Sequence, residues 1–352
     1  MSTSVSRAAA GPGEQAVTAE RCAAQLLCGE PARSAAEVAR RLLAIQAQDP
    51  RGARLTVRAR SAGVSASDVD AELASRSMIV TWLNRGTLHL VRAEDYWWLH
   101  PLTTPQVGTG NARRLAQEGV PPQDAERGVA AVTAALAADG PLTRPQLRER
   151  VAAAGVRTEG QALIHVLLLA SIRGLIVRGP RVGQEQAFVL VRDWLGAPPA
   201  AMDREAALGE LARRYLAGHA PAADGDLAKW AGIGLRDARL GLARCGAVQR
   251  PDGLAGLPAG PPPPAALPPP RLLGAFDPLL LGWASRDPIT GPHKQIVTTN
   301  GLFRPFALAG GRAVATWSFA GGQVTLAPFA PLARETEAAL AADAADVTRF
   351  LK

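Results

Sequence analysis

Two glutamines, Gln46 and Gln48, are the residues of this chain whose type and spacing most readily suggest chemistry. A side-chain amide is a poor base and nucleophile, but it can donate and accept hydrogen bonds and so hold a water molecule. Such a pair suits a reaction whose leaving group is already activated. Arg51 and Arg54 follow closely and could contact an anionic substrate. The alternative is that the two amides only cap the C-terminal end of a helix.

Other catalytic signatures are missing from the sequence. It has no GxxxxGK[ST], HExxH, GxSxG or CxxC motif, and Gly108-Thr109-Gly110 lacks the third glycine of a dinucleotide fingerprint. With three lysines in the chain, a Schiff base would have to use Lys229 or Lys294. No pair of histidines has metal-ligand spacing; the five are His89, His100, His165, His219 and His293. We therefore expect neither a metal ion nor another cofactor.

The composition favours a polyanionic partner. The chain of 352 residues carries a formal charge of +8, and three lysines among 39 basic residues leave 36 arginines. Arginine binds phosphate through two parallel hydrogen bonds, which suits a nucleic-acid backbone. A codon bias toward high GC content is the alternative reason for the arginine excess.

The remaining bulk features indicate a cytoplasmic protein. Cys22, Cys28 and Cys245 are odd in number and lack metal-ligand spacing, which is typical of reduced thiols. No apolar run approaches the ~20 residues that span a bilayer. The N-terminus has no apolar segment typical of a signal peptide.

The order of predicted elements indicates an α+β fold that is mainly helical. After residues 1–16, which we expect to be disordered, helices are followed by strands 78–83 and 87–91 around the turn Asn84-Arg85-Gly86. Helices followed by a hairpin make a winged helix, here residues 17–122. The helices of this unit are predicted over residues 18–27, 34–48 and 67–74, the second opened by a capping box at Ser34 to Glu37.

The same order recurs twice. Residues 123–200 give helices, one opened by a capping box at Thr143 to Gln146, then strands 175–178 and 187–191. Residues 201–257 give three more helices and weaker strand signals. Three tandem winged-helix units are therefore predicted. A proline-rich connector, 258–270, then leads to a small antiparallel β-rich unit over 271–352, closed by a helix from residue 336.

Winged helices usually read DNA, although they also serve as protein-interaction modules. The segment 162–172 is too apolar to lie in a groove, so we expect it in the core, with His165 satisfied there. Arg85, Thr87 and His89 alternate on one predicted strand and so share a face. Arg178 and Arg181 lie on the predicted hairpin 178–186, which could enter a groove and wedge the duplex.

Four motifs, in order, carry a resemblance to a known family. They are Ile45-Gln-Ala-Gln48-Asp-Pro50, Thr81-Trp-Leu-Asn-Arg-Gly-Thr-Leu-His-Leu-Val91, Leu273-Gly-Ala-Phe-Asp277 continuing to Arg286-Asp287, and Asn300-Gly-Leu-Phe-Arg-Pro305. Together they resemble the AlkZ-type winged-helix DNA glycosylases over about residues 18–350. Each motif alone is weak, and their order on a tandem winged-helix layout gives them weight.

The resemblance implies a monofunctional glycosylase that removes N7-alkylated purines, including bulky adducts and interstrand crosslinks, and that protects a producer of a DNA-alkylating natural product. It places the catalytic pair on Gln46 and Gln48. Ala47 is smaller than the apolar residue usual between them. The partner is then double-stranded DNA bearing such purines, bound by a monomer. Arg85, Thr87 and His89 would border the lesion, whereas Asp277, Arg286 and Asp287 could form only a structural ion pair.

Two other classes of function remain open on the sequence. One is a non-catalytic winged-helix regulator, although a dimerisation helix and a polar recognition helix are not obvious. The other is a protein that sequesters adducts without cutting them. Formation of abasic sites separates a glycosylase from both.

Overall fold

The computed structural model describes residues 12–258 and 267–352. Most of the predicted connector, and residues 1–11 of the expected disordered start, lie outside this range. The expectation is wrong for residues 12–16, because helix α1 spans Pro12–Ala24. None of the helices in the described part of the chain is long and apolar enough to cross a membrane.

The helix expected to reach Gln48 ends six residues earlier. Helix α2 spans Ala35–Leu42, and the Ser34 hydroxyl accepts a hydrogen bond from the Glu37 amide at 3.1 Å, as the capping signal predicted. Leu43 then adopts a left-handed φ of +64°, which breaks the helix. The sequence analysis also missed helix α3, Pro50–Arg58, which Asp49 caps by accepting from the Arg51 amide. Helix α4, Ala66–Ala74, was expected.

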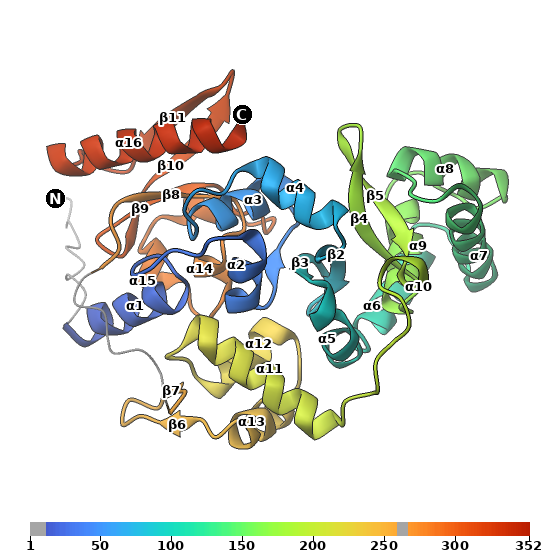
Figure 1. The fold of residues 1–352 in the computed structure, drawn as a ribbon, viewed down its shortest axis with the longest axis horizontal. Helices are drawn as coiled ribbons and strands as arrows, with labels where there is room; N and C mark the ends of the chain where they lie inside the picture. The colour runs from blue at the N-terminus through green and yellow to red at the C-terminus, as the bar shows by residue number, and fades with distance from the viewer. Residues whose placement is uncertain (1–11, 259–266) are drawn as a thin grey trace, which may run out of the picture.

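The first two predicted hairpins join in one antiparallel sheet. Its strands are β1 (Ile45–Gln46), β2 (Met78–Leu83), β3 (Thr87–Arg92), β4 (Ile176–Val182) and β5 (Glu185–Leu190), in the order β1-β3-β2-β4-β5 (Figure 1). Val80 of β2 pairs with Arg178 of β4 and so links the hairpins. Strands β4 and β5 run further toward the hairpin tip than predicted, pairing as far as Val182 with Glu185.

The two faces of this sheet belong to two different hydrophobic cores. Ala47, Val80 and Phe188 pack in one core, with side chains of α2, α3, α4 and the helices near β5. Ile79 and Val91 pack in the other, with side chains from helices below the sheet in Figure 1. Successive residues of a strand point to opposite faces. The face that a strand residue occupies therefore decides which core or cavity its side chain can reach.

Further helices cover both faces and follow the predicted order. Those between β3 and α11 are η1 (Ala93–Asp95), α5 (Tyr96–Thr103), α6 (Val107–Gln117), α7 (Pro122–Asp139), α8 (Arg144–Ala153), α9 (Ala162–Ile172) and α10 (Val191–Trp194). Helix α9 is mainly buried, as its composition predicted, and His165 bonds Asn111 through Nδ1 at 2.7 Å. Three helices and a short hairpin come next: α11 (Arg204–His219), α12 (Asp224–Ala231), α13 (Leu235–Arg244), β6 (Val248–Gln249) and β7 (Ala255–Gly256).

The C-terminal part contains a four-stranded antiparallel sheet in the order β11-β10-β9-β8. Its elements are β8 (Arg271–Leu273), α14 (Pro278–Leu281), α15 (Asp287–Thr290), η2 (Lys294–Ile296), β9 (Phe306–Ala309), β10 (Arg312–Ala320), β11 (Gln323–Pro328) and α16 (Arg334–Leu351). The predicted α+β class is therefore confirmed. Within this β-rich part, the apolar run 295–299 begins in η2 and is not part of the sheet.

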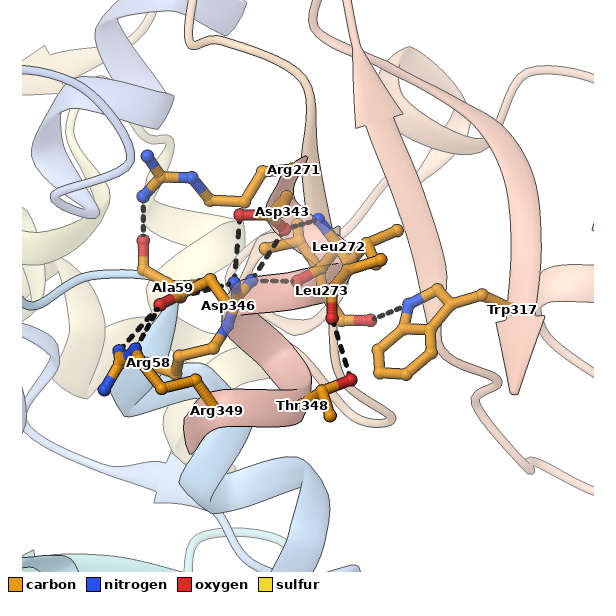
Figure 2. A network of polar contacts seen from close by, with 11 residues as sticks. Arg58, Ala59, Arg271, Leu272, Leu273, Trp317, Asp343, Asp346, Thr348 and Arg349 are labelled. Atoms are coloured by element: carbon orange, nitrogen blue, oxygen red, sulfur yellow. Dashed lines mark hydrogen bonds and ion pairs between the residues drawn. The ribbon is translucent and has the colours of Figure 1, made fainter. Parts of the chain in front are cut away.

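Buried ion pairs fasten the C-terminal part to the first helices. Arg58 of α3 donates to both Asp343 oxygens of α16, at 2.9 and 3.0 Å, and to the Leu272 carbonyl at 2.6 Å (Figure 2). Arg60 and Asp277, both fully buried, form two parallel bonds of 2.9 and 2.8 Å. Asp277 therefore pairs with Arg60, and its place in the motif is structural.

Candidate active site

Gln46 and Gln48 lie on an extended segment at the edge of the five-stranded sheet. Gln46 stands opposite His89 of β3, and the Ala47 amide donates to the Leu88 carbonyl at 2.7 Å. The helix-cap alternative is therefore wrong for this pair. Because paired residues of neighbouring strands share a face, Gln46 projects from the face that carries His89, whereas Ala47 packs in the opposite core and Gln48 lies in the bend after β1.

The two amides have different freedom. Gln48 is exposed, and its Oε1 accepts the Leu88 amide at 3.2 Å. That bond orients the Gln48 amide, so its Nε2 group projects as a donor. Gln46 is only 7% exposed, and among the described residues no hydrogen bond to its amide is recorded. Its amide thus keeps both donor and acceptor capacity for a ligand or a water molecule.

His89 is neutral at physiological pH. Burial, reinforced weakly by Arg85, lowers the pKa of His89 to about 3, against the raising effect of its bond to Thr87. The imidazole is 3% exposed, and its Nδ1 lies 2.9 Å from the Thr87 carbonyl. A carbonyl only accepts, so Nδ1 carries the proton and Nε2 is an acceptor. In this form His89 can accept a hydrogen bond beside Gln46.

Arg51 and Arg181 are exposed around the segment of the two glutamines, whereas the Arg54 side chain is only 13% exposed. Arg54 of α3 and Arg181 of the β4–β5 hairpin both form ion pairs with Asp70 of α4, the second at 3.3 Å. Arg51 lies over the Phe319 ring, with its guanidinium carbon 5.6 Å from the centroid. One carboxylate therefore holds together two arginines that were predicted to bind DNA.

Arg85, Thr87 and Arg178 have internal roles in the structure. Arg85 donates to the Lys229 and Trp230 carbonyls at 2.6 Å, near the C-terminal end of α12. The Thr87 hydroxyl is buried without a hydrogen-bond partner among the described residues.

Arg178 lies on the sheet face opposite to Gln46. It pairs with Val80, whereas His89 pairs with Thr81, the next residue of β2, and neighbouring strand residues point to opposite faces. Its guanidinium carbon is 5.0 Å from the Trp82 ring and 4.8 Å from the Phe188 ring. Burial lowers the pKa of Arg178 to about 10. These contacts account for Arg178 as a packing residue.

The sequence analysis missed the contribution of the loop before α14. Gly52 of α3 presses on this loop, because a Cβ atom built at Gly52 would lie 2.3 Å from the Ala275 oxygen. The loop therefore runs beside the helix that starts two residues after Gln48. The segment Leu273-Gly-Ala-Phe-Asp277 was noticed as a motif, but the backbone approach at Gly52 is visible only in the fold.

An open pocket of about 720 Å³ lies further along the chain, after α14, and residues within 284–299 line it. Its lining includes Arg286, His293, Lys294 and Thr298. Arg286 and Asp287 were offered as members of a structural ion pair; Arg286 instead donates to the Leu280 carbonyl at 3.0 Å, and Asp287 opens α15. In the described ranges, no group of three or more His, Cys, Asp or Glu is placed to hold a metal ion.

The chain is similar to known proteins over most of its length. The family model described as DNA glycosylase AlkZ-like matches residues 39–350. A protein of Streptomyces sahachiroi named interstrand DNA cross-link repair glycosylase is 27% identical over 344 residues, covering 90% of each chain. The solved structure of Streptomyces sahachiroi DNA glycosylase AlkZ matches with a TM-score of 0.76 and 26% identity over 96% of each chain. The chain therefore belongs to the AlkZ-like DNA glycosylase family, as its motifs predicted, and is a hydrolase of N-glycosyl bonds.

Proposed function

We propose that this protein removes N7-alkylated purines, including bulky adducts and interstrand crosslinks, from double-stranded DNA. The observation that carries the proposal is the pairing of Gln46 with His89 at the sheet edge, with Gln48 held beside them by the Leu88 amide. The relative named for cross-link repair supports the choice of lesion. We further propose that the enzyme acts as a cytoplasmic monomer and protects its host from a DNA-alkylating natural product.

The chemistry of the lesion matches what amides can do. An N7-alkylguanine is cationic, so its C1′–N9 bond is already weakened and the base needs no protonation to leave. The oxygen of a water molecule bonds to C1′, and the C1′–N9 electron pair neutralises the purine ring. The proton released from the water passes to solvent. The protein has to position that water and stabilise an oxocarbenium-like sugar, and positioning alone supplies several kcal/mol.

The two glutamines divide this work according to their hydrogen bonds. The Leu88 amide fixes the Gln48 oxygen, which leaves the Gln48 Nε2 group to donate to the water or to the DNA. Gln46 faces the acceptor Nε2 of neutral His89 across the strand pair. Donation from the Gln46 Nε2 group to His89 would turn the Gln46 oxygen toward the attacking water. Directly opposite residues of paired strands have Cβ atoms about 5 Å apart, within reach of such a bond.

Contacts with the DNA backbone are assigned to the arginines around the segment of the two glutamines. Arg51, Arg54 and Arg181 fit this role, and a phosphate could take the place of Asp70 between the last two. Arg85 and Arg178 are assigned to support of the site because their guanidinium groups contact other parts of the protein, and Thr87 because its hydroxyl is buried.

The experiment compares release of N7-methylguanine from duplex DNA, read as abasic sites, by the wild type and by Gln46→Ala with Gln48→Ala. We expect the double variant to lose release by at least about a hundredfold and to keep its affinity for DNA. The matched control is Gln123→Ala, an exposed glutamine on α7. An unchanged rate in the double variant would refute the assignment of the site. A wild type that binds this DNA without releasing base would favour sequestration.

A further inference from the structure

Phe276 is held in a conformation that an aromatic residue rarely adopts. Its φ is +57°, in the left-handed region that favours glycine and asparagine. The residue is only partly buried. Strain of this kind persists where the surrounding structure imposes it, and it concentrates at functional sites. The Phe276 conformation therefore calls for a reason beyond packing.

The Phe276 ring is supported from one side. Its centroid lies 5.2 Å from that of Phe303, with the ring planes tilted by 38°. The Arg286 guanidinium lies 4.9 Å from the Phe303 centroid and is itself held by the Leu280 carbonyl. Phe303 and Arg286 thus form a rigid backing for an aromatic side chain that remains partly exposed.

This aromatic stack runs beside the elements that carry the candidate catalytic residues. The Ala275 backbone presses on Gly52 in the first turn of α3, just after Gln48. On the other side Lys229 donates to the Ala284 carbonyl at 2.9 Å, and the Lys229 carbonyl accepts from Arg85 in the turn before β3. The loop of Phe276 is therefore anchored next to the segment of Gln48, and the loop of Arg286, on the other side of α14, is anchored next to the turn before β3. The 720 Å³ pocket opens along the loop of Arg286.

We propose that Phe276 is the platform on which the alkylated purine stacks while its glycosidic bond is cut. The inference rests on the proposed function and adds the residue that recognises the base. A purine stacks well on an aromatic ring. A cationic purine is also attracted to the negative face of that ring, whereas an unmodified neutral guanine is not. Phe276 would therefore contribute selectivity for the charged lesion.

The test measures DNA binding in the Gln46→Ala, Gln48→Ala background, so that the lesion survives the assay. Two duplexes of one sequence are compared, one with N7-methylguanine and one with a tetrahydrofuran abasic analogue, which has no base to stack. We expect Phe276→Leu to weaken binding to the methylguanine duplex about tenfold and to leave binding to the tetrahydrofuran duplex unchanged. Phe276→Tyr keeps the ring and should stay within about twofold of the parent on both.

Two further variants make the result decisive. Phe276→Asn suits a positive φ and removes the ring, so it replaces Phe276→Leu if thermal melting shows that the leucine variant is unfolded. Trp97→Leu removes a partly buried aromatic of α5 and should change neither affinity. Equal losses on both duplexes, or no loss on either, would overturn the platform. If the wild type forms no abasic sites, the proposed function is wrong. If the wild type is active but Phe276→Leu binds the methylguanine duplex as tightly as its parent, only the role of Phe276 as a platform is wrong.

Discussion

Acidification should destabilise the protein well above the pH at which carboxylates titrate, because two histidines are buried in the neutral form. Burial lowers the pKa values of His89 and His219 to about 3 each. His219 lies fully buried against Tyr215, with ring centroids 4.7 Å apart. In the unfolded chain a histidine has a pKa of about 6.5. The unfolded state therefore binds more protons than the folded state once the pH falls below about 6.5.

The direction and size follow from this difference. The stability associated with each neutral histidine is fully present above pH 6.5 and is lost as the pH falls toward 3. Between pH 7 and pH 5 each unfolded histidine gains most of a proton and each folded one gains almost none. The expected loss is about 2 kcal/mol per histidine, so about 4 kcal/mol for His89 and His219 together. Burial also lowers the pKa of His100, which adds to the loss in the same direction.

The assay is denaturant unfolding at pH 7 and at pH 5 for the wild type and for His89→Gln. The variant should lose about 2 kcal/mol less than the wild type between the two pH values, whatever its stability at pH 7. His293→Gln is the control, since His293 is only partly buried and lies outside the site, and this variant should keep most of the pH-dependent loss. Equal losses in His89→Gln and the wild type would show that His89 is not buried as a neutral acceptor. The role assigned to it beside Gln46 would fall as well.

Two other predictions test the rest of the structure. Asp277→Asn leaves the Arg60 charge buried without its partner and should cost about 3–5 kcal/mol of stability. The control, Asp139→Asn at an exposed pair with Arg150, should cost less than about 1 kcal/mol. Similar melting temperatures in the two variants would contradict the buried pair. Arg181→Gln should weaken binding to duplexes of any sequence and reduce the slope of log affinity against log salt concentration by about 1. The melting temperature of the protein should stay nearly unchanged. An unaltered salt slope would show that Arg181 does not contact DNA phosphate.

Local signals predicted the elements well where the chain itself determines them. The Asn84-Arg85-Gly86 turn joins two paired strands, and Asn84 and Gly86 both have positive φ, as such a turn requires. Ser34 caps α2 as expected. The α2 boundary was missed because the segment after Leu42 is fixed by partners remote in sequence. Strand β1 lies in that segment and forms only by pairing with β3, more than forty residues away.

The candidate catalytic residues were found from the sequence, but their geometry was not. Two glutamines separated by one residue share a face on an extended segment and diverge on a helix. Strand pairing places Gln46 opposite His89, and the Leu88 amide holds Gln48 beside them; the spacing alone could not predict either contact.

Arginine positions were the least predictable part of the site. A net charge of +8 gives no indication of which guanidinium groups are free to meet DNA. Arg58, Arg60 and Arg214 are buried and paired with carboxylates from distant segments. Arg178 was expected on the DNA surface, yet β2–β4 pairing places it on the core face opposite to Gln46. Successive residues of a strand point to opposite faces of the sheet. The register of one strand pair therefore decides whether an arginine points into the core and stabilises the fold or points outward and can bind phosphate.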